Sequence, residues 1–320
     1  LSGLHSLGVD RLSLGAQSAR NDELRMLHRI HSWEEVVRAV DAARASGIEN
    51  LNLDLLFGLP GQSLRTWRET VETALELDPE HLSLYGLSIE RGTLLAEWIA
   101  NGDLAPPDED RTATMYELAE EMLVGAGFFH YEISSWAKAD PESWSGDRLW
   151  WAGCDGSGDV VQQTEAFSSY VCRHNLTYWR NEPWLGVGAG AHSWMTVEVL
   201  RRASTHPVRA VRGQRWGSVC HPKDYALAAG GATCLEALRR DVETIDRRLE
   251  MGETMMLGLR LAEGVTAERF GARFGVGLAD VFGEELRDLQ RLGLLFWDGV
   301  VARLTARGRL LGNRVFERFI

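Results

Sequence analysis

A short extended run followed by an amphipathic helix occurs three times in the first 125 residues, and this repetition limits the possible folds most. The extended runs cover residues 10–15, 51–57 and 81–88, and each has the length and the apolar or alternating pattern of a β-strand. Repeated strand–helix units predict parallel strands joined by right-handed crossovers. The sequence therefore predicts an α/β protein.

The three helices have recognisable boundaries. The first begins at Ser32, where Glu35 completes a capping box, and it ends at Gly47. The second carries apolar residues over 64–75 and stops before an Asp-Pro pair at 78–79, and the third runs from about 109 to Gly125. Three such units are too few to close a barrel, and residues 1–8 resemble the end of a preceding helix. We therefore expect this chain to hold the last part of a larger barrel.

The remainder of the chain has a different organisation. Residues 140–171 show neither helical nor strand periodicity, and we expect a tryptophan-containing insertion there. After residue 240, helical patterns cover 241–259, 266–274 and 278–292, followed by strands at 294–297 and 300–304 and a final helix from Thr305. Asp298-Gly299 predicts the hairpin turn between these strands. The expected domains are 1–130, a connecting region 131–240, and a small helical, winged-helix-like domain 241–320.

Charge and composition exclude several classes of protein. The net charge is −12, and residues 241–320 hold twelve arginines and no lysine against thirteen acidic residues. This balance argues against nucleic-acid binding, even for the winged-helix-like domain. No apolar stretch is long enough for an integral membrane segment, and no signal peptide is visible. The four cysteines form no C-x-x-C pair and suit reduced thiols in the cytoplasm.

Polar residues lie where the predicted parallel strands end, which is where such folds bind ligands. Gln17 follows the first strand, and Asp54 lies inside the second. A carboxylate among apolar strand residues is costly to bury unless it is paired, and its alternative role is to accept a hydrogen bond from a nearby backbone amide. Arg29 precedes the first helix and can bind a ligand carboxylate, or it is an ordinary surface arginine.

A second candidate site lies at 172–193, where Cys-Arg-His-Asn-Leu-Thr-Tyr-Trp is followed by Gly-Val-Gly-Ala-Gly-Ala-His-Ser. A neutral imidazole at His174 can ligate iron, flat aromatic side chains can cover a macrocycle, and glycines let a ligand approach the backbone. The alternative is an aromatic core turn whose histidine only satisfies a hydrogen bond. The Gly186-x-Gly188-x-x-Ala191 spacing also mimics a dinucleotide fingerprint, but a strand-like run at 194–200 follows it.

Taken together, these motifs resemble one family. Gln17, Arg29, Asp54 and the Phe-Gly-Leu-Pro-Gly-Gln turn at 57–62 resemble the S-adenosylmethionine-binding part of radical SAM enzymes of the oxygen-independent coproporphyrinogen III oxidase group. The histidine motif and the glycine run resemble the heme-chaperone branch of that group. The resemblance covers nearly the whole chain, apart from the insertion. It implies a partial (β/α) radical SAM barrel with the C-terminal domain of the same group.

The resemblance assigns roles to individual residues. Gln17, Arg29 and Asp54 would contact S-adenosylmethionine, with Arg29 on its carboxylate and Asp54 on its ribose or adenosine edge. His174 would bind heme as a ligand of its iron, and His192 is the second candidate. The family's three closely spaced cysteines, which hold a 4Fe-4S cluster, have no counterpart here. We therefore expect the chain alone to perform no radical chemistry, because no cluster can deliver an electron to S-adenosylmethionine.

Three functions compete. The leading hypothesis is a heme-binding chaperone of the radical SAM family that delivers heme to acceptor proteins. The alternative is an oxygen-independent coproporphyrinogen III oxidase, an enzyme of porphyrin biosynthesis that catalyses oxidative decarboxylation. The histidine–aromatic motif favours the first, because the oxidase branch is not expected to share it. A winged-helix regulator is the third, and the acidic C-terminal charge balance argues against it.

Overall fold

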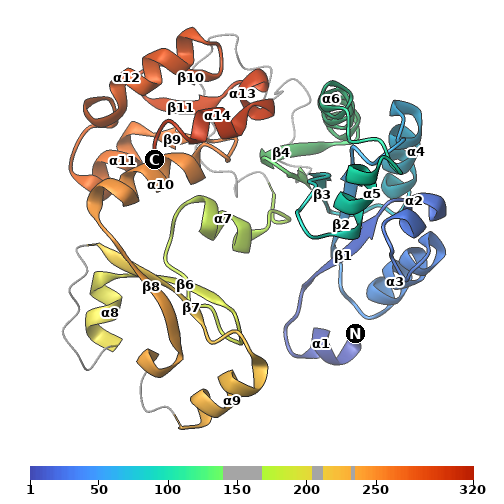
Figure 1. The fold of residues 1–320 in the computed structure, drawn as a ribbon, viewed down its shortest axis with the longest axis horizontal. Helices are drawn as coiled ribbons and strands as arrows, with labels where there is room; N and C mark the ends of the chain where they lie inside the picture. Colours follow the sequence, from blue (N-terminus) through green and yellow to red (C-terminus); the bar gives the residue numbers. More distant parts are fainter. Residues whose placement is uncertain (140–167, 204–211, 232–234) are drawn as a thin grey trace. The chain divides into compact units, whose positions relative to one another are not determined.

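The computed structural model describes residues 1–139, 168–203, 212–231 and 235–320, and it divides into two compact units, 1–171 and 172–320 (Figure 1). Each unit is described by itself. Most of the expected insertion at 140–171, including its three tryptophans, lies outside the described residues. Cys154 and Cys234 also lie outside them, and Cys220 is an exposed free thiol.

The first unit is built on a five-stranded sheet. Its strands β1 (Arg11–Gln17), β2 (Asn50–Phe57) and β3 (His81–Gly86) are parallel, as the repeated strand–helix units predict. The sheet continues through β5 (Ser135–Lys138) and β4 (Phe128–Glu132), in the order β1-β2-β3-β5-β4. The β4–β5 hairpin, in which β5 is antiparallel to both of its neighbours, was not predicted from the sequence.

Helices α3 (Trp33–Ala45), α4 (Leu64–Leu75) and α6 (Glu109–Gly125) pack on one face of this sheet and form its core. Glu35 accepts the backbone N–H of Ser32 at 2.8 Å, which confirms the predicted capping box. Trp67 is fully buried, and its indole Nε1 donates to the carbonyl of Met115 at 2.8 Å, joining α4 to α6. The other helices are α1 (Ser2–Ser6), α2 (Asn21–Met26) and α5 (Leu94–Asn101).

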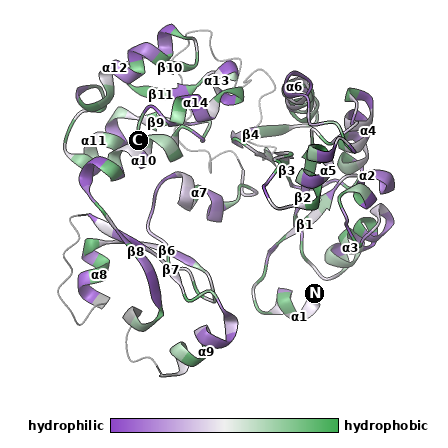
Figure 2. Ribbon diagram, in the orientation of Figure 1, coloured by the Kyte–Doolittle hydropathy of each residue, from purple (hydrophilic) through white to green (hydrophobic). Residues whose placement is uncertain are grey.

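The second unit begins with α7 (Arg173–Trp179) and an antiparallel sheet of β6 (His192–Thr196), β7 (Gly213–Ser218) and β8 (Arg239–Ile245). Helices α8 (Val197–Ala203) and α9 (Pro222–Gly231) and a 3-10 turn (Leu235–Leu238) complete this region. The predicted strand-like run at 194–200 is correct only as far as Thr196. Figure 2 shows β8 as a largely hydrophilic ribbon, in keeping with its mostly exposed residues.

The predicted helix at 241–259 is wrong in its first third. Residues 239–245 form strand β8, and the helix is α10 (Arg247–Gly258). Asp246 causes the change of structure, because its carboxylate accepts the backbone N–H of Leu249 at 2.8 Å and caps α10. Before this cap, residues 239–245 pair with β7 and so form a strand. Their polar sequence does not indicate this pairing.

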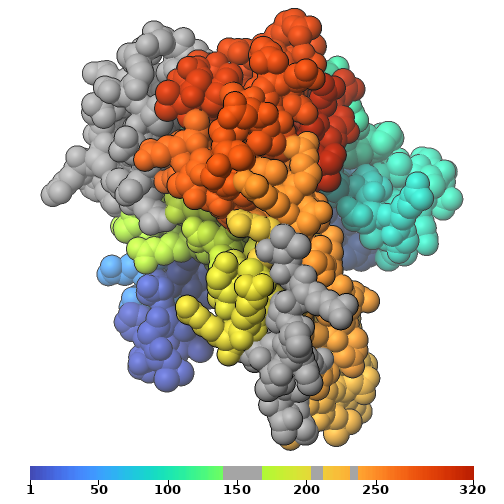
Figure 3. Space-filling model, turned by 90° about the vertical axis from the view of Figure 1, so that its left-hand side faces the viewer, coloured from blue at the N-terminus to red at the C-terminus, as the bar shows by residue number. Residues whose placement is uncertain are grey.

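The rest of the C-terminal domain contains the next two predicted helices and the predicted hairpin. Helices α11 (Ala267–Phe274) and α12 (Leu278–Arg291) precede β10 (Leu295–Trp297) and β11 (Val301–Leu304), which pair antiparallel, and β9 (Val265–Thr266) adds a third strand. The predicted final helix is broken at Leu311 into α13 (Ala306–Leu310) and α14 (Gly312–Phe316). In Figure 3 these helices, coloured orange to red, form one continuous surface that adjoins the yellow-green α7 segment. None of the described helices combines the length and apolar character needed to cross a membrane.

Candidate functional site

The face of the first sheet opposite the helices carries a row of polar side chains. Strand register sets Ser13, Asn52 and His81 side by side on β1, β2 and β3, and it sets Asp54 beside Ser83 two residues further along. These residues alternate with the leucines of the core because successive strand residues point to opposite faces. A row of mostly buried polar side chains therefore runs along this face toward the carboxyl ends of the strands.

A buried hydrogen-bonded chain organises this polar row. His81 is 1% exposed, and its Nδ1 lies 2.5 Å from Oδ1 of Asn52 while its Nε2 lies 2.8 Å from the hydroxyl of Tyr131. Burial lowers the pKa of His81 well below 6.5, and the positive charge of Arg11 lowers it further. The imidazole is therefore neutral, so Nδ1–H donates to Asn52 and Nε2 accepts from Tyr131.

Asp54 receives the end of this chain. Asn52 Nδ2 donates to its Oδ1 at 2.7 Å, and the hydroxyl of Ser13 donates to its Oδ2 at 3.1 Å. The carboxylate is half-buried, so it is oriented by the strands and still accessible. This arrangement differs from the backbone-capping role considered from the sequence, since side chains supply both of these hydrogen bonds.

Gln17 ends β1 in an unusual conformation. Its φ of 65° lies in the left-handed region, which is uncommon outside glycine, and the β1–β2 register shifts between Leu14 and Gln17. A Cβ added to Gly15 would lie 2.6 Å from Nε2 of Gln17, so the missing side chain at Gly15 leaves room for the glutamine amide. Strained backbone of this kind is typical of functional positions.

Arg29 lies in the loop between α2 and α3, is exposed, and forms no ion pair with any residue that the structure describes. Two residues later, Nε2 of His31 lies 3.4 Å from the carbonyl of Ala16, the residue before Gln17. The loop that carries Arg29 therefore returns to the end of β1. A free guanidinium on such a loop is suited to a ligand carboxylate.

The Phe-Gly-Leu-Pro-Gly-Gln turn is held to α2 by a buried carboxylate. Gln62 Nε2 donates to Oε2 of Glu23 at 3.2 Å, and the hydroxyl of Ser18 donates to the same oxygen at 2.6 Å. Burial raises the pKa of Glu23, although these two hydrogen bonds and the charge of Arg20 act in the opposite direction. The turn thus joins the end of β2 to the segment that follows Gln17.

In the second unit, α7 presents its histidine to solvent. His174 is exposed, and its ring packs edge-on against Tyr178, one turn later, with centroids 4.8 Å apart and planes at 85°. Tyr178 in turn packs against Trp184 at 4.6 Å. The alternative of a core histidine is therefore wrong for His174, because the core residue of this helix is Leu176 at 2% exposure.

One glycine of the run is required by close packing, and another lies where its missing side chain leaves open space. A Cβ on Gly186 would lie 2.1 Å from the carbonyl oxygen of His192, so this position requires glycine. Gly188, by contrast, has a φ of 113° and no atom near its missing Cβ. His192 is exposed on β6, and its ring lies over Gly217.

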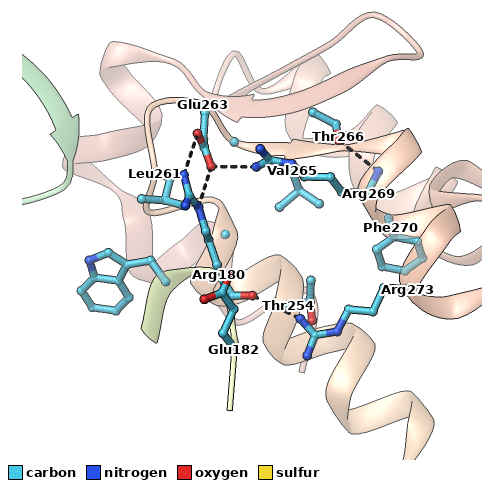
Figure 4. Close-up of a pocket in the computed structure, with 13 residues that line it drawn as sticks. Arg180, Glu182, Thr254, Leu261, Glu263, Val265, Thr266, Arg269, Phe270 and Arg273 are labelled. Atoms are coloured by element: carbon cyan, nitrogen blue, oxygen red, sulfur yellow. Dashed lines mark hydrogen bonds and ion pairs between the residues drawn. The ribbon is translucent and has the colours of Figure 1, made fainter. Parts of the chain in front are cut away.

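Behind α7 the second unit contains a pocket of about 320 Å³, bounded by the end of α7, α10, the segment around Glu263, and α11 (Figure 4). Glu263 accepts from Arg180 Nε at 3.2 Å and from Arg269 Nη1 at 2.9 Å. Arg273 Nη2 donates to the carbonyl of Asn181 at 2.7 Å. The guanidinium groups along this wall are thus engaged by acidic or carbonyl oxygens of the protein.

Sequence reasoning identified the residues at the strand ends and the histidine motif but missed the buried chain behind them. The missed residues are Ser13, Asn52, His81, Ser83 and Tyr131. A signal was present for most of them, because polar residues alternate with leucine at 11–14, 50–55 and 81–84. Among the residues that the structure describes, no three His, Cys, Asp or Glu side chains are placed to hold a metal ion.

Comparisons with known proteins come from sequence families and from solved structures. The model of the radical SAM superfamily matches residues 1–74, and that of the HemN C-terminal domain matches residues 245–311. The heme chaperone HemW of Bacillus subtilis is 34% identical over 99% of this chain and 71% of its own length. Heme chaperone HemW of Lactococcus lactis is 31% identical over 98% of this chain and 69% of its own length, and that of Escherichia coli is 32% identical over the same shares.

A solved structure described as the coproporphyrinogen III oxidase HemN from Escherichia coli, a radical SAM enzyme, has a TM-score of 0.68 to this chain. It is 20% identical, and the match covers 99% of this chain and 65% of that one. At this identity the likeness concerns the fold alone. It confirms the predicted fold class, an α/β partial barrel of the radical SAM type followed by a small C-terminal domain.

Proposed function

The chain belongs to the heme chaperone HemW family of the radical SAM superfamily, and from this premise we propose that it binds heme and passes it to acceptor proteins. The observation that carries the proposal is the exposed His174 packed on Tyr178, with Trp184 beyond it. An accessible imidazole can ligate heme iron, and flat aromatic rings can pack against a porphyrin. An exposed site also suits a carrier, since its cargo must be released to another protein.

His174 is the proposed axial ligand of the heme iron, and His192 is the second candidate. Both imidazoles are exposed. They are linked through the aromatic pair, because Tyr178 packs on Trp184, whose indole Nε1 donates to the carbonyl of His192 at 3.1 Å. His174 is preferred because its own ring contacts an aromatic side chain, whereas the ring of His192 lies over Gly217.

We also propose that Gln17, Arg29 and Asp54 contact S-adenosylmethionine. The donor set fits this ligand: Arg29 has a guanidinium free to bind the amino-acid carboxylate, and Asp54 has an oriented, accessible carboxylate for ribose hydroxyls. The amide of Gln17 completes the set at the end of β1. Membership of the superfamily also implies a 4Fe-4S cluster, but the described residues do not offer a set of ligands that fits one.

The coproporphyrinogen oxidase alternative is less well supported. The relatives that are at least 30% identical over most of the chain include heme chaperones from several bacteria, whereas the oxidase is matched through its structure at 20% identity. The histidine motif, which the chaperone proposal requires, is exposed and aromatic-lined. We therefore propose the carrier function and retain the oxidase only as the alternative.

Optical titration with heme tests the carrier proposal. Iron coordination shifts the porphyrin spectrum, so we expect His174→Ala to lose the ligated spectrum and to bind heme at least about tenfold more weakly. His221→Ala is the matched control, because His221 is also exposed and its ring contacts the carboxylate of Asp224 at 3.8 Å, away from the aromatic motif. Equal spectra and affinities for the wild type and His174→Ala would refute the role of His174. Loss of the signal only in His192→Ala would transfer the ligand role to His192.

A further inference from the structure

The C-terminal end of α7 is held by an arginine from the C-terminal domain. A helix leaves its last carbonyl groups without partners inside the helix. Arg273 of α11 donates from Nη1 to the carbonyl of Arg180 at 3.1 Å and from Nη2 to that of Asn181 at 2.7 Å. Its positive charge also lies at the negative end of the helix dipole. One side chain thus satisfies two carbonyls in the segment that ends α7.

Arg273 is itself fixed in place. Its Nε and Nη2 donate to Oε1 of Glu250 at 2.9 and 2.8 Å, and Glu250 is only 2% exposed. The other carboxylate oxygen of Glu250 accepts from Nε of Arg212. A planar guanidinium bound on several edges has little freedom to rotate, so Arg273 is a rigid support.

The segment after α7 is also fixed from other directions. Asn181 is fully buried with a φ of 51°, its Nδ2 donates to Thr254 at 3.2 Å, and its Oδ1 accepts from Trp194 Nε1 at 3.0 Å. Figure 4 shows Arg180 directed toward Glu263 and Arg273 approaching from α11. Helices α10 and α11 and strand β6 therefore converge on two consecutive residues.

Helix α7 needs this support because it is only seven residues long. A helix of two turns is not stable by itself in water, so its orientation depends on tertiary contacts. We propose that Arg273 is a positioning residue for His174: the C-terminal domain holds α7 through Arg273 and so sets the direction in which the imidazole meets heme iron. The inference rests on the proposed heme function of His174.

A double-mutant cycle with heme as the ligand tests this role. The variants are Arg273→Gln, Arg273→Lys, His174→Ala and the double variant Arg273→Gln/His174→Ala, each titrated with heme and followed by its optical spectrum. We expect Arg273→Gln to weaken heme binding about tenfold and to reduce the histidine-ligated fraction, because two charge-assisted hydrogen bonds to the end of α7 are lost. Arg273→Lys should recover part of the affinity, since an ammonium can still donate to one carbonyl.

The double variant distinguishes positioning from a general loss of structure. If Arg273 acts through His174, then Arg273→Gln has no further effect in the His174→Ala background. An equal loss in both backgrounds would overturn the inference, as would an unchanged spectrum in Arg273→Gln. Arg291→Gln on α12 is the control, because it removes an exposed arginine that pairs with Asp288. If His174→Ala binds heme like the wild type, that result refutes the proposed role of His174. The role of Arg273 is tested only if His174→Ala weakens heme binding.

Discussion

A single buried histidine links the polar face of the first sheet to its candidate site. His81 receives a hydrogen bond from Tyr131 and donates one to Asn52, which in turn donates to Asp54. Because Oδ1 of Asn52 accepts from the Nδ1–H of His81, its Nδ2 is left to donate to Asp54. The orientation of Asp54 thus depends on a histidine that does not touch it.

This histidine should make stability depend on pH. In the unfolded chain its imidazole binds a proton below about pH 6.5, whereas burial keeps it neutral in the folded protein. Its stabilising contribution is therefore complete above that pH and is lost as the pH falls toward the lower folded-state pKa. We expect a decrease in unfolding free energy of about 1.4 kcal/mol per pH unit below 6.5 from this residue.

Denaturant unfolding at pH 7.5, 6.5 and 5.5 measures this effect. In His81→Gln the unfolding free energy should depend less on pH than in the wild type. The difference in slope should correspond to about one proton fewer taken up on unfolding. His221→Gln is the control, because His221 is exposed and does not belong to the hydrogen-bonded chain of His81. An unchanged slope in His81→Gln would mean that another group causes any pH dependence observed.

The sequence predicted those residues of the candidate site that stand next to a recognisable sequence feature. Gln17 and Asp54 were found from their place near strand ends, and His174 from its aromatic neighbours. Asn52 and His81 were missed because their importance arises from strand register, which brings β2 and β3 together. The support of α7 by Arg273 joins residues more than 90 positions apart, and no local pattern reveals it.

At the scale of elements, prediction succeeded where a segment has a clear period and a clear boundary. Helices α3, α4 and α6 have both, and so does the hairpin whose turn residue Asp298 accepts the backbone N–H groups of Val300 and Val301. Prediction failed where tertiary contacts decide the structure. Strand β8 is polar and exposed along most of its length, so only its pairing with β7 makes it a strand.

The segment between α7 and β6 is a second case in which close packing decides the structure. Trp184 and Trp194 exchange backbone hydrogen bonds at 2.8 and 3.0 Å, and Gly186 lies against the carbonyl of His192. We expect Gly186→Ala to lower the unfolding free energy by about 1–3 kcal/mol, because its methyl group cannot fit there without displacing the backbone. It should also alter the heme spectrum, since Trp184 packs on Tyr178.

Denaturant unfolding and heme titration of this variant give both readouts. Gly230→Ala is the matched control, because a Cβ on Gly230 in α9 would meet no atom within 4 Å. In that helix, alanine should be neutral or stabilising by up to about 1 kcal/mol. A Gly186→Ala protein as stable as the wild type would show that the segment can move away from His192 at little cost.

At the scale of the whole chain, the two kinds of candidate site belong to different compact units. The proposed contacts to S-adenosylmethionine all lie within residues 1–171, and the proposed heme ligand lies within 172–320. The residues that carry each proposal therefore form their described contacts within one unit. This separation predicts where each ligand should slow the exchange of backbone amide hydrogens.

A ligand stabilises the structure to which it binds and so reduces local opening, which hydrogen exchange with mass spectrometry measures peptide by peptide. Heme should protect peptides from α7, the glycine run and β6, and leave β1, β2 and β3 unchanged. The protection should disappear in His174→Ala and persist in His221→Ala. S-adenosylmethionine at high concentration should protect peptides that end β1 and β2, and Asp54→Asn should reduce that protection. If heme instead protects the peptides of β1 to β3, the heme site does not belong to the second unit alone, and His174 is not sufficient to explain its binding.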